Sequence, residues 1–233
     1  MEKHLQLAGK TIAITGSSKG IGKETALLLQ NLGANLVLGS RSNNDQLSEN
    51  VLSLHLDVTD EQSVKNFYER AVQQFGTVDV LINSAGVGMF EPIIDSSTDH
   101  FDQMILVNLR GTYLTCKYFG KHMAERGKGQ IINLVSIAGT TALPGCGGYS
   151  ASKFGVLGLT KVLQAELRQK GVQVTAVLPG AVNSSFWETI EPKPDVSNMI
   201  PTETVAKHLL YLITQPPGAF VDEITIMPPL GIL

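Results

Sequence analysis

The chain has 233 residues, of which 43% are hydrophobic and 17% charged, a composition typical of a protein that buries one sizeable core. Its net charge of -3 gives no basic field that would attract nucleic acid or an anionic membrane, so a small-molecule partner is expected. No apolar stretch of about 18 residues occurs, and the first ten residues contain no apolar run of signal-peptide length. We expect one cytoplasmic domain over residues 1–233, without membrane insertion.

The cysteines and histidines give no indication of a metal site. Cys116 and Cys146 are thirty positions apart, and reduced thiols are the simplest interpretation. The histidines have no zinc-ligand spacing and are His4, His55, His100, His122 and His208. No metal is expected.

Short β-branched runs alternate with stretches of helical periodicity along the whole chain. The expected strands are Lys10–Thr15, Asn35–Gly39, Val51–Leu56, Val78–Ile82, Gln130–Val135, Val172–Val177 and Val221–Met227. The expected helices are Gly20–Leu32, Glu61–Phe75, Thr98–Met123, Tyr149–Gln169 and Thr202–Thr214. This alternation predicts an α/β protein with a doubly wound Rossmann fold, a seven-stranded and mostly parallel sheet with helices on both faces.

Two connecting segments depart from the regular alternation. Ser40–Asn50 is short and polar, so a crossover helix there must be stunted or absent. Val182–Pro201 includes the proline-rich stretch Glu191–Pro201 and follows the sixth strand, at the sheet edge where ligands bind in such folds. We interpret Val182–Pro201 as a substrate lid, with a plain surface loop as the alternative.

A glycine-rich loop joins the first expected strand to the first expected helix. Glycines at this turn allow a pyrophosphate to approach the backbone, and the helix N-terminus offers free N–H groups and partial positive charge. A purely steric role for the glycines is the alternative. The candidate cofactor-binding residues of this loop are Gly16, Ser18, Lys19, Gly20, Ile21 and Gly22.

The end of the second strand indicates which dinucleotide is preferred. An acidic residue there would bind the adenosine ribose hydroxyls, but this chain has Ser40 and Arg41. An arginine without a neighbouring carboxylate suits a 2′-phosphate, and Lys19 adds a second positive charge. NADP is therefore favoured over NAD, unless both cations are merely exposed basic residues.

Tyr149 and Lys153 lie four positions apart at the start of an expected helix, so their side chains share a face. Tyrosine has an unperturbed pKa of about 10, and a neighbouring ammonium lowers the pKa by stabilising the phenolate. Such a pair suits proton transfer near neutral pH, although the same spacing is also common where a ring packs beside a solvated amine.

Taken together, the motifs resemble the short-chain dehydrogenase/reductase family in its compact single-domain form. They are Thr15–Gly22, Asn83–Gly86, Asn108, Ser136, Tyr149–Lys153 and Pro179–Gly180, in this order and at strand ends or helix starts. The resemblance covers essentially the whole chain and implies hydride transfer between a nicotinamide cofactor and a carbonyl or alcohol compound.

The resemblance also implies a role for each catalytic candidate. Tyr149 would be the general acid in reduction and the general base in oxidation, and Lys153 would lower its pKa and bind the nicotinamide ribose. Ser136 would donate a hydrogen bond to the substrate oxygen, and Asn108 would hold a water that links Lys153 to solvent. Capping of local backbone is the alternative for Ser136 and for Asn108.

Further cofactor contacts follow from the same resemblance. Asp57 and Val58 would contact the adenine, and Asn83, Ala85 and Gly86 would contact the adenosine ribose and nearby backbone. Ser84 departs mildly from the commoner Asn-Asn-Ala-Gly form. The remaining candidates are Pro179, Gly180, Val182 and Ser184, of which Ser184 retains a hydroxyl where threonine is usual.

The C-terminal residues Phe220–Pro229 replace the Val-Asp-Gly-Gly ending of β-ketoacyl-acyl-carrier-protein reductases. The ending looks more like that of relatives that act on small aldehydes, ketones or hydroxy acids. A β-ketoacyl-acyl-carrier-protein reductase and a non-catalytic NADP(H)-binding regulator stay as alternatives, with an epimerase or dehydratase ranked last.

Three side chains and two helices complete the expectations. Cys146 would line the substrate pocket or pack beneath the loop, and Phe186 and Trp187 would form an apolar wall or anchor the lid. A homodimer or homotetramer built from the helices Thr98–Met123 and Tyr149–Gln169 is implied by the resemblance.

Overall fold

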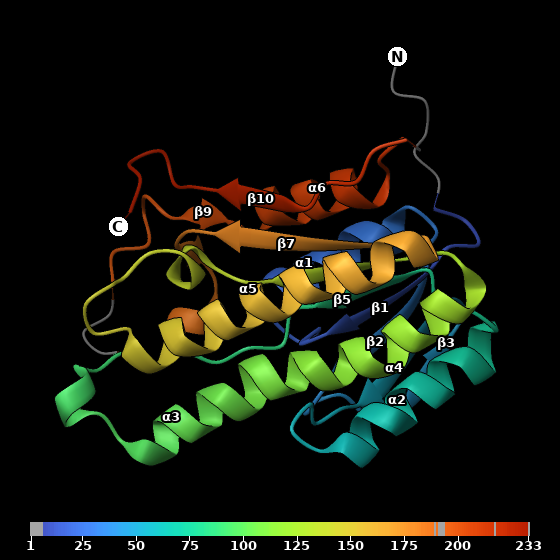
Figure 1. Cartoon of the computed structure of the whole chain (residues 1–233). Helices are drawn as coiled ribbons and strands as arrows, with labels where there is room; N and C mark the ends of the chain where they lie inside the picture. Colours follow the sequence, from blue (N-terminus) through green and yellow to red (C-terminus); the bar gives the residue numbers. More distant parts are fainter. Residues whose placement is uncertain (1–6, 189, 191–193, 217, 233) are drawn as a thin grey trace.

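An eight-stranded sheet forms the middle layer of the protein in the computed structural model, which describes residues 7–188, 190, 194–216 and 218–232. Figure 1 shows this sheet with helices packed against it. In spatial order its strands are β10 (Glu223–Ile226), β7 (Val172–Pro179), β6 (Gly129–Leu134), β5 (Val80–Asn83), β1 (Thr11–Thr15), β2 (Asn35–Ser40), β4 (Val51–His55) and β3 (Gln46–Ser48). Only the pairing of β3 with β4 is antiparallel in this sheet.

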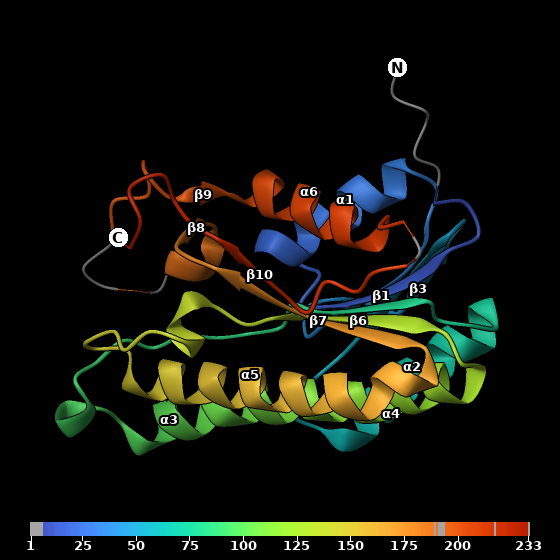
Figure 2. The same cartoon turned by 45° about the horizontal axis from the view of Figure 1, so that its top comes forward.

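Helices cover both faces of the sheet (Figure 2). One face carries α1 (Gly20–Asn31) and α6 (Thr202–Ile213), and the other carries α2 (Glu61–Phe75), α4 (Gly111–Arg126) and α5 (Gly147–Leu167). Side chains of β1 alternate between the two layers, because successive residues of a strand point to opposite faces. Ile12 and Ile14 pack toward α1 and α6, whereas Ala13 packs toward α2 and α4.

The predicted doubly wound fold with helices on both faces is confirmed, but the predicted number of seven strands is wrong by one. The additional strand is β3, which lies in the Ser40–Asn50 segment. Its three residues are exposed, so it has no buried alternation from which a strand could be predicted. No helix forms in this segment, in agreement with the expectation of a stunted or absent crossover.

The predicted helix Thr98–Met123 is interrupted in the structure. It consists of α3 (Thr98–Met104), a π-helical turn (Ile105–Arg110) and α4 (Gly111–Arg126). Single π-turns within helices are rare and occur frequently at functional sites. The turn contains Asn108, one of the predicted catalytic residues.

The predicted lid Val182–Pro201 begins and ends in a small parallel ladder of β8 (Val182–Asn183) and β9 (Ile200–Pro201). A 3-10 turn, Ser185–Trp187, follows β8. Residues 189 and 191–193 of the lid lie outside the described part of the chain. None of the helices in the described ranges has the length and apolar character that a bilayer crossing requires.

Candidate active site

A cavity of about 960 Å³ lies at the carboxyl ends of the parallel strands. The chain reverses its direction of winding here, since β2 and β5 flank β1 on opposite sides. Ligands of doubly wound folds bind at such a switch point. Residues directly after β1, β5, β6 and β7 line the cavity, among them Gly16, Ser84, Ser136 and Gly180.

The loop after β1 has the shape of a dinucleotide cradle. Gly16 has a φ of 67°, and a Cβ atom on it would lie 2.7 Å from the Cα atom of Ala85. A Cβ atom on Gly22 would overlap the carbonyl oxygen of Gly16. Helix α1 begins at Gly20 without a side-chain cap. The first backbone N–H groups of this helix therefore have no side-chain partner and can donate to a ligand in the loop. These features fit a pyrophosphate.

Basic side chains lie beside this loop. Lys19 and Arg41 are exposed and line the cavity; Lys19 ends the turn that follows β1, and Arg41 is the first residue after β2. Ser40 is buried and its Oγ donates to Oδ1 of Asn43 at 2.6 Å, which fixes the backbone just before Arg41. Arg41 forms no ion pair among the described residues, so its guanidinium can bind an anionic group in the cavity.

Asp57 lies at the same end of the cavity and stays ionised. Burial alone would raise the pKa of its carboxyl, but hydrogen bonds from Thr59 and the charge of Arg41 lower the pKa overall. The Thr59 backbone N–H and hydroxyl donate to Asp57 Oδ1 at 2.9 and 2.8 Å. Because Thr59 orients the carboxylate, Asp57 and Val58 form a defined wall next to Arg41.

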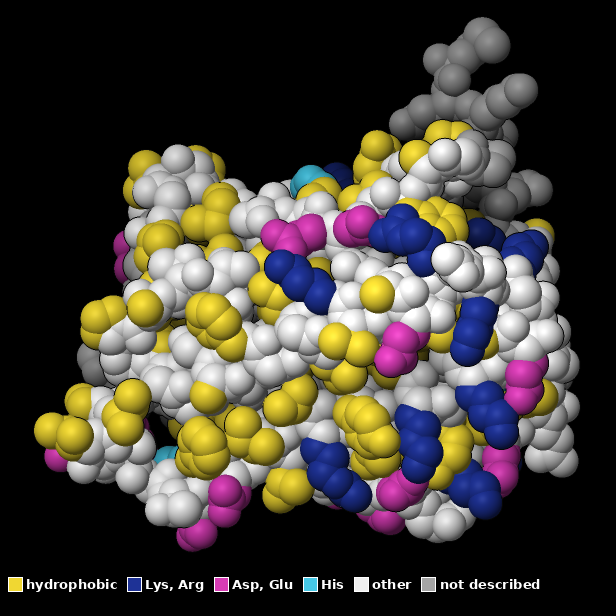
Figure 3. All heavy atoms as spheres, viewed as in Figure 1, with side chains coloured by type: hydrophobic (Ala, Val, Ile, Leu, Met, Phe, Trp, Pro, Cys, Tyr) yellow, Lys and Arg dark blue, Asp and Glu magenta, His cyan; other side chains and the backbone are white. Residues whose placement is uncertain are grey.

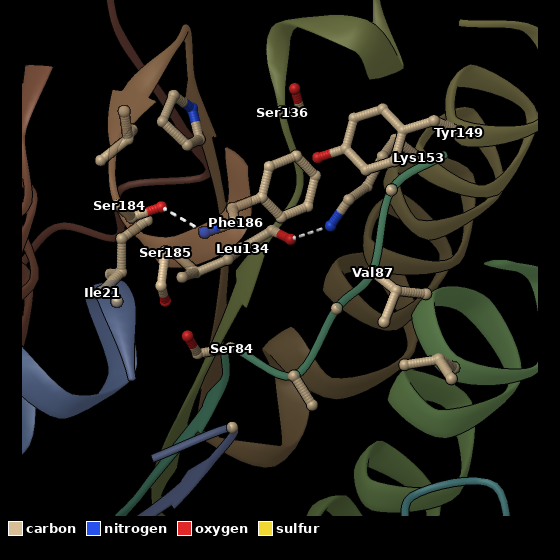
Figure 4. A pocket seen from close by; sticks show the side chains of 18 of the residues that line it. Ile21, Ser84, Val87, Leu134, Ser136, Tyr149, Lys153, Ser184, Ser185 and Phe186 are labelled. Atoms are coloured by element: carbon tan, nitrogen blue, oxygen red, sulfur yellow. Dashed lines mark hydrogen bonds between the residues drawn. The ribbon is translucent and has the colours of Figure 1, made fainter. Parts of the chain in front are cut away.

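Tyr149, Lys153 and Ser136 meet at the other end of the cavity (Figure 4). Tyr149 and Lys153 come from the first turns of α5, and Ser136 follows β6. The Lys153 Nζ donates to the carbonyl oxygen of Leu134 at 2.9 Å and lies 5.6 Å from the centre of the Tyr149 ring. The Ser136 Oγ accepts from the N–H of Ala138 at 3.1 Å, so its O–H is not used by the local backbone and can be donated to Tyr149 or to a ligand.

The titration of this pair differs from the sequence expectation. Burial raises the pKa of Tyr149 to about 12, against a smaller lowering by a hydrogen bond from Ser136. Burial also lowers the pKa of Lys153 to about 8. The expected lowering of the Tyr149 pKa by Lys153 is thus wrong for this arrangement, because the amine is directed at Leu134 and desolvation dominates both groups.

Asn108 lies behind the cavity wall and holds that wall together. Its side chain is buried, donates to the carbonyl of Val87 and to the Ser152 hydroxyl, each at 2.9 Å, and accepts from the N–H of Val87 at 2.8 Å. Its own backbone carbonyl accepts from the Thr112 hydroxyl at 2.7 Å. Asn108 therefore connects the π-turn to the loop after β5 and to the helix that carries Tyr149 and Lys153.

Most of the predicted site residues line this one cavity. They are Gly16, Ser18, Lys19, Gly20, Ile21, Ser40, Arg41, Asp57, Val58, Ala85, Gly86, Ser136, Tyr149, Lys153, Pro179, Gly180, Val182 and Ser184. Gly22, Asn83 and Asn108 are buried behind it. The Asn83 side chain is turned inward, where it donates to Asn133 Oδ1 at 2.8 Å and accepts from the Thr115 hydroxyl at 2.7 Å.

Several cavity residues were not predicted. One of them is Ser185, whose hydroxyl is buried without a hydrogen-bond partner. The predicted neighbour Ser184 differs in this respect, because its hydroxyl accepts from the N–H of Phe186 at 3.3 Å. The carbonyl of Leu134 and the side chains of Met89 and Phe90 also belong to the cavity. The sequence marks Ser185 only by its position after Ser184, and nothing in its pattern marks the other three.

An aromatic cluster surrounds the proton-donating end of the cavity. The ring centre of Tyr149 lies 5.5 Å from that of Phe90 and 5.8 Å from that of Phe186. Trp187 stacks on Phe90 at 5.7 Å, and its Nε1 donates to the carbonyl of Val182 at 2.8 Å. Trp187 thus anchors the segment after β8 and also supplies part of an apolar wall. Cys146 lines the same end, and burial raises the pKa of its thiol.

Among the described residues, no three or more histidine, cysteine or acidic side chains are grouped so that they would hold an ion.

Comparison with known proteins identifies the family. Residues 10–195 match the model of the short chain dehydrogenase family. The chain belongs to this family of oxidoreductases. An uncharacterised oxidoreductase of Staphylococcus aureus (strain MRSA252) is 36% identical over 230 residues, which cover 95% of this chain and 98% of that protein.

Two solved structures share the fold over nearly the whole chain. ElxO with NADP bound superimposes with a TM-score of 0.83 at 30% identity and covers 93% of this chain and 96% of its own. The 3-ketoacyl-(acyl-carrier-protein) reductase from Brucella melitensis complexed with NADH gives a TM-score of 0.86 at 25% identity, with 94% and 98% covered. A nicotinamide dinucleotide is therefore the cofactor class of these neighbours.

Proposed function

We propose that this protein transfers a hydride between NADP(H) and a small carbonyl or alcohol compound. The observation that carries the proposal is the single cavity with two different ends. One end has the glycine cradle with Arg41 and Lys19, and the other has Tyr149, Lys153 and Ser136. Binding and proton transfer are thereby joined in one space.

Each residue at the catalytic end has a task that its geometry supports. A bound nicotinamide ring supplies or accepts the hydride. The Tyr149 hydroxyl, with a pKa raised to about 12, is protonated at neutral pH and donates its proton to the substrate oxygen during reduction. Ser136 donates a hydrogen bond to the same oxygen. The Lys153 amine, 5.6 Å from the centre of the Tyr149 ring, would bind the ribose hydroxyls of the cofactor.

Two observations support NADP over NAD. Arg41 and Lys19 are exposed at the cradle end, and neither has an ion-pair partner among the described residues. The only carboxylate that lines the cavity in these ranges, Asp57, already accepts two hydrogen bonds from Thr59. A 2′-phosphate placed beside Arg41 would form charge-assisted hydrogen bonds there.

The test is NADPH oxidation at about 340 nm with a panel of aldehydes, ketones and β-ketoacyl thioesters. We expect turnover by the wild-type protein and a loss of about 100-fold or more in Tyr149→Phe, because general acid catalysis contributes about 10²–10⁴-fold. Calorimetric titration with NADPH should show similar affinity for both proteins. Tight NADPH binding without turnover of any substrate would favour the regulator hypothesis instead.

A further inference from the structure

The substrate end of the cavity is almost entirely apolar. Besides the catalytic hydroxyls, the hydroxyls of Ser184 and Ser185 and the exposed amide of Gln103, the side chains near this end are those of Met89, Phe90, Val107, Leu143, Cys146, Phe186, Trp187 and Ile232. None of these side chains is charged. The cavity-lining charges in the described ranges are Lys19, Arg41 and Asp57, which follow β1, β2 and β4, and Lys153, which donates to Leu134.

Apart from Lys153, whose amine already donates to the carbonyl of Leu134, a charged substrate group would have no partner of opposite charge at this end. Transfer of a carboxylate from water into such a site, without a compensating charge or hydrogen bonds, costs roughly several kcal/mol of binding free energy. The rings of Phe90 and Phe186 lie 5.5 and 5.8 Å from the Tyr149 ring, so a substituent on the reacting carbonyl must contact them. This end of the cavity therefore offers mainly apolar contacts to such a substituent.

The segment beside the pocket is acidic. Between Arg70 and Arg110 the sequence has no lysine or arginine, and residues 91–102 contain Glu91, Asp95, Asp99 and Asp102. The three aspartates are exposed, and only Glu91 has an ion-pair partner in the described structure, His100 at 3.2 Å. We call residues 91–102 the acidic rim.

The acidic rim lies against the start of α5, the helix that carries the catalytic pair. Glu91 forms a β-bridge with Cys146, and a Cβ atom on Gly147 would overlap the side chain of Ile93. Figure 3 shows acidic side chains together with apolar ones at the lower left of the molecule, in the region of α3. Negative charge there repels an anionic partner within a Debye length of about 8–10 Å.

We infer that the substrate is an uncharged, largely apolar carbonyl compound that enters free in solution, and that substrates carried by an acidic protein are disfavoured. This inference rests on the proposed function and names its substrate class. The aromatic cluster accounts for the preference for apolar substituents, and the acidic rim accounts for the exclusion of anions.

Trp187 provides a direct readout of binding, because it is the only tryptophan in the chain and lies in the pocket wall. Its fluorescence is titrated in Tyr149→Phe with bound NADP, which prevents turnover. The ligands are 4-methylcyclohexanone and the similarly shaped anion 4-oxocyclohexanecarboxylate. We expect the ketone to bind at least about tenfold more tightly, the ratio that about 1.4 kcal/mol produces. Equal or tighter binding of the carboxylate would overturn the inference.

A second comparison tests the mode of delivery in the wild-type enzyme. Acetoacetyl-N-acetylcysteamine, a free neutral thioester, and the same acyl group on acyl carrier protein are compared by kcat/KM with NADPH. We expect the free thioester to be used at least as well as the carrier-bound form. A kcat/KM tenfold higher for the carrier-bound form would overturn the exclusion of acidic carriers while leaving the proposed hydride transfer intact.

Two variants assign the selectivity to its residues. Asp99→Lys combined with Asp102→Lys should raise kcat/KM for 4-oxocyclohexanecarboxylate severalfold and leave that for the neutral ketone unchanged. Phe186→Ala should lower kcat/KM for 4-methylcyclohexanone at least tenfold, with the Kd for NADPH unchanged. The matched control for this variant is Phe220→Ala, which should leave kcat/KM unchanged because this exposed ring packs on Arg168 outside the cavity. If the wild-type enzyme turned over none of these substrates, the result would count against the proposed function. If it turned over the anionic substrate in preference to the neutral one, the result would count against this inference alone.

Discussion

The charge of Lys153 is sensitive to pH in an accessible range, because burial lowers its pKa to about 8. The ammonium form predominates below that pH and is lost as the pH rises through it. Tyr149, with a pKa raised to about 12, stays protonated throughout. We therefore predict that kcat/KM for NADPH, which reports the free enzyme, is level below pH 8 and falls above it.

Lys153→Arg provides the matched variant for this pH profile, because a guanidinium stays charged over the same range. The fall above pH 8 should disappear in this variant, even where its overall rate is lower. A wild-type profile that falls only above pH 10 would show that the amine has its ordinary pKa.

Arg41 determines the preference for the phosphorylated cofactor in the proposed function. Arg41→Asp should weaken NADPH binding about 100-fold and leave NADH binding nearly unchanged, since charge-assisted hydrogen bonds contribute about 1.5–3 kcal/mol each. Calorimetry with both cofactors measures the effect. The control is Lys23→Asp, an exposed cation of α1 that does not line the cavity. Equal losses for NADPH and NADH would show that Arg41 does not bind the phosphate.

Residue types and spacing predicted which side chains share the cavity but not how each is directed. The four-residue spacing predicted that Tyr149 and Lys153 share a helix face, and both line the cavity. The hydrogen bond of Lys153 to Leu134 depends on a backbone carbonyl, which has no sequence signature. Asn83 illustrates the same limit, because its inward hydrogen bonds require partners on β6 and α4 that no local pattern reveals.

Among the elements, the π-helical turn connects the fold most directly to the site. The buried side chain of Asn108 in this turn makes three hydrogen bonds, two to the Val87 backbone and one to Ser152. Asn108→Ala should destabilise the protein by about 2–4 kcal/mol, because each buried polar group left unpaired costs about 1–3 kcal/mol. Urea unfolding measures the change. Asn66→Ala, which removes an exposed acceptor on α2, should cost less than about 0.5 kcal/mol.

Helical periodicity predicted the span of this region but not its interruption. The single π-helical turn shifts the apolar pattern of the following helix only slightly. Residues 98–123 therefore still match the periodicity of a continuous α-helix. Strand β3 escaped prediction for a related reason, since its three residues bury nothing. Elements with a long buried face were predicted to within a few residues, whereas short exposed ones were not.

At the scale of the whole molecule, the alternation of strands and helices was sufficient to predict the doubly wound sheet and the edge where the site lies. The buried strands β1, β5 and β7 have apolar stretches that occur in parallel sheets covered on both faces. Oligomeric state depends on surfaces instead. Helices α4 and α5 pack side by side (Figure 1), and both present exposed apolar side chains.

The outer face of α5 has the pattern of an interface with a second copy of the chain. Phe154, Gly158 and Val162 are spaced four residues apart and form one stripe, in which Phe154 is 48% and Val162 54% exposed. A Cβ atom on Gly158 would contact nothing within 4 Å, so a partner helix has room to approach. Tyr113 on α4 is exposed as well.

We predict that two copies pair through this stripe, so that light scattering after gel filtration gives a mass of at least twice the 25.0 kDa of the chain. A twofold interface brings the same surface of both copies together, so one substitution places two like charges in the contact. Phe154→Asp should therefore lower the mass, whereas Leu47→Asp, at an exposed apolar residue of β3, should not. A wild-type mass of 25.0 kDa would contradict the prediction, since the stripe would then be a solvent-exposed surface of a monomer.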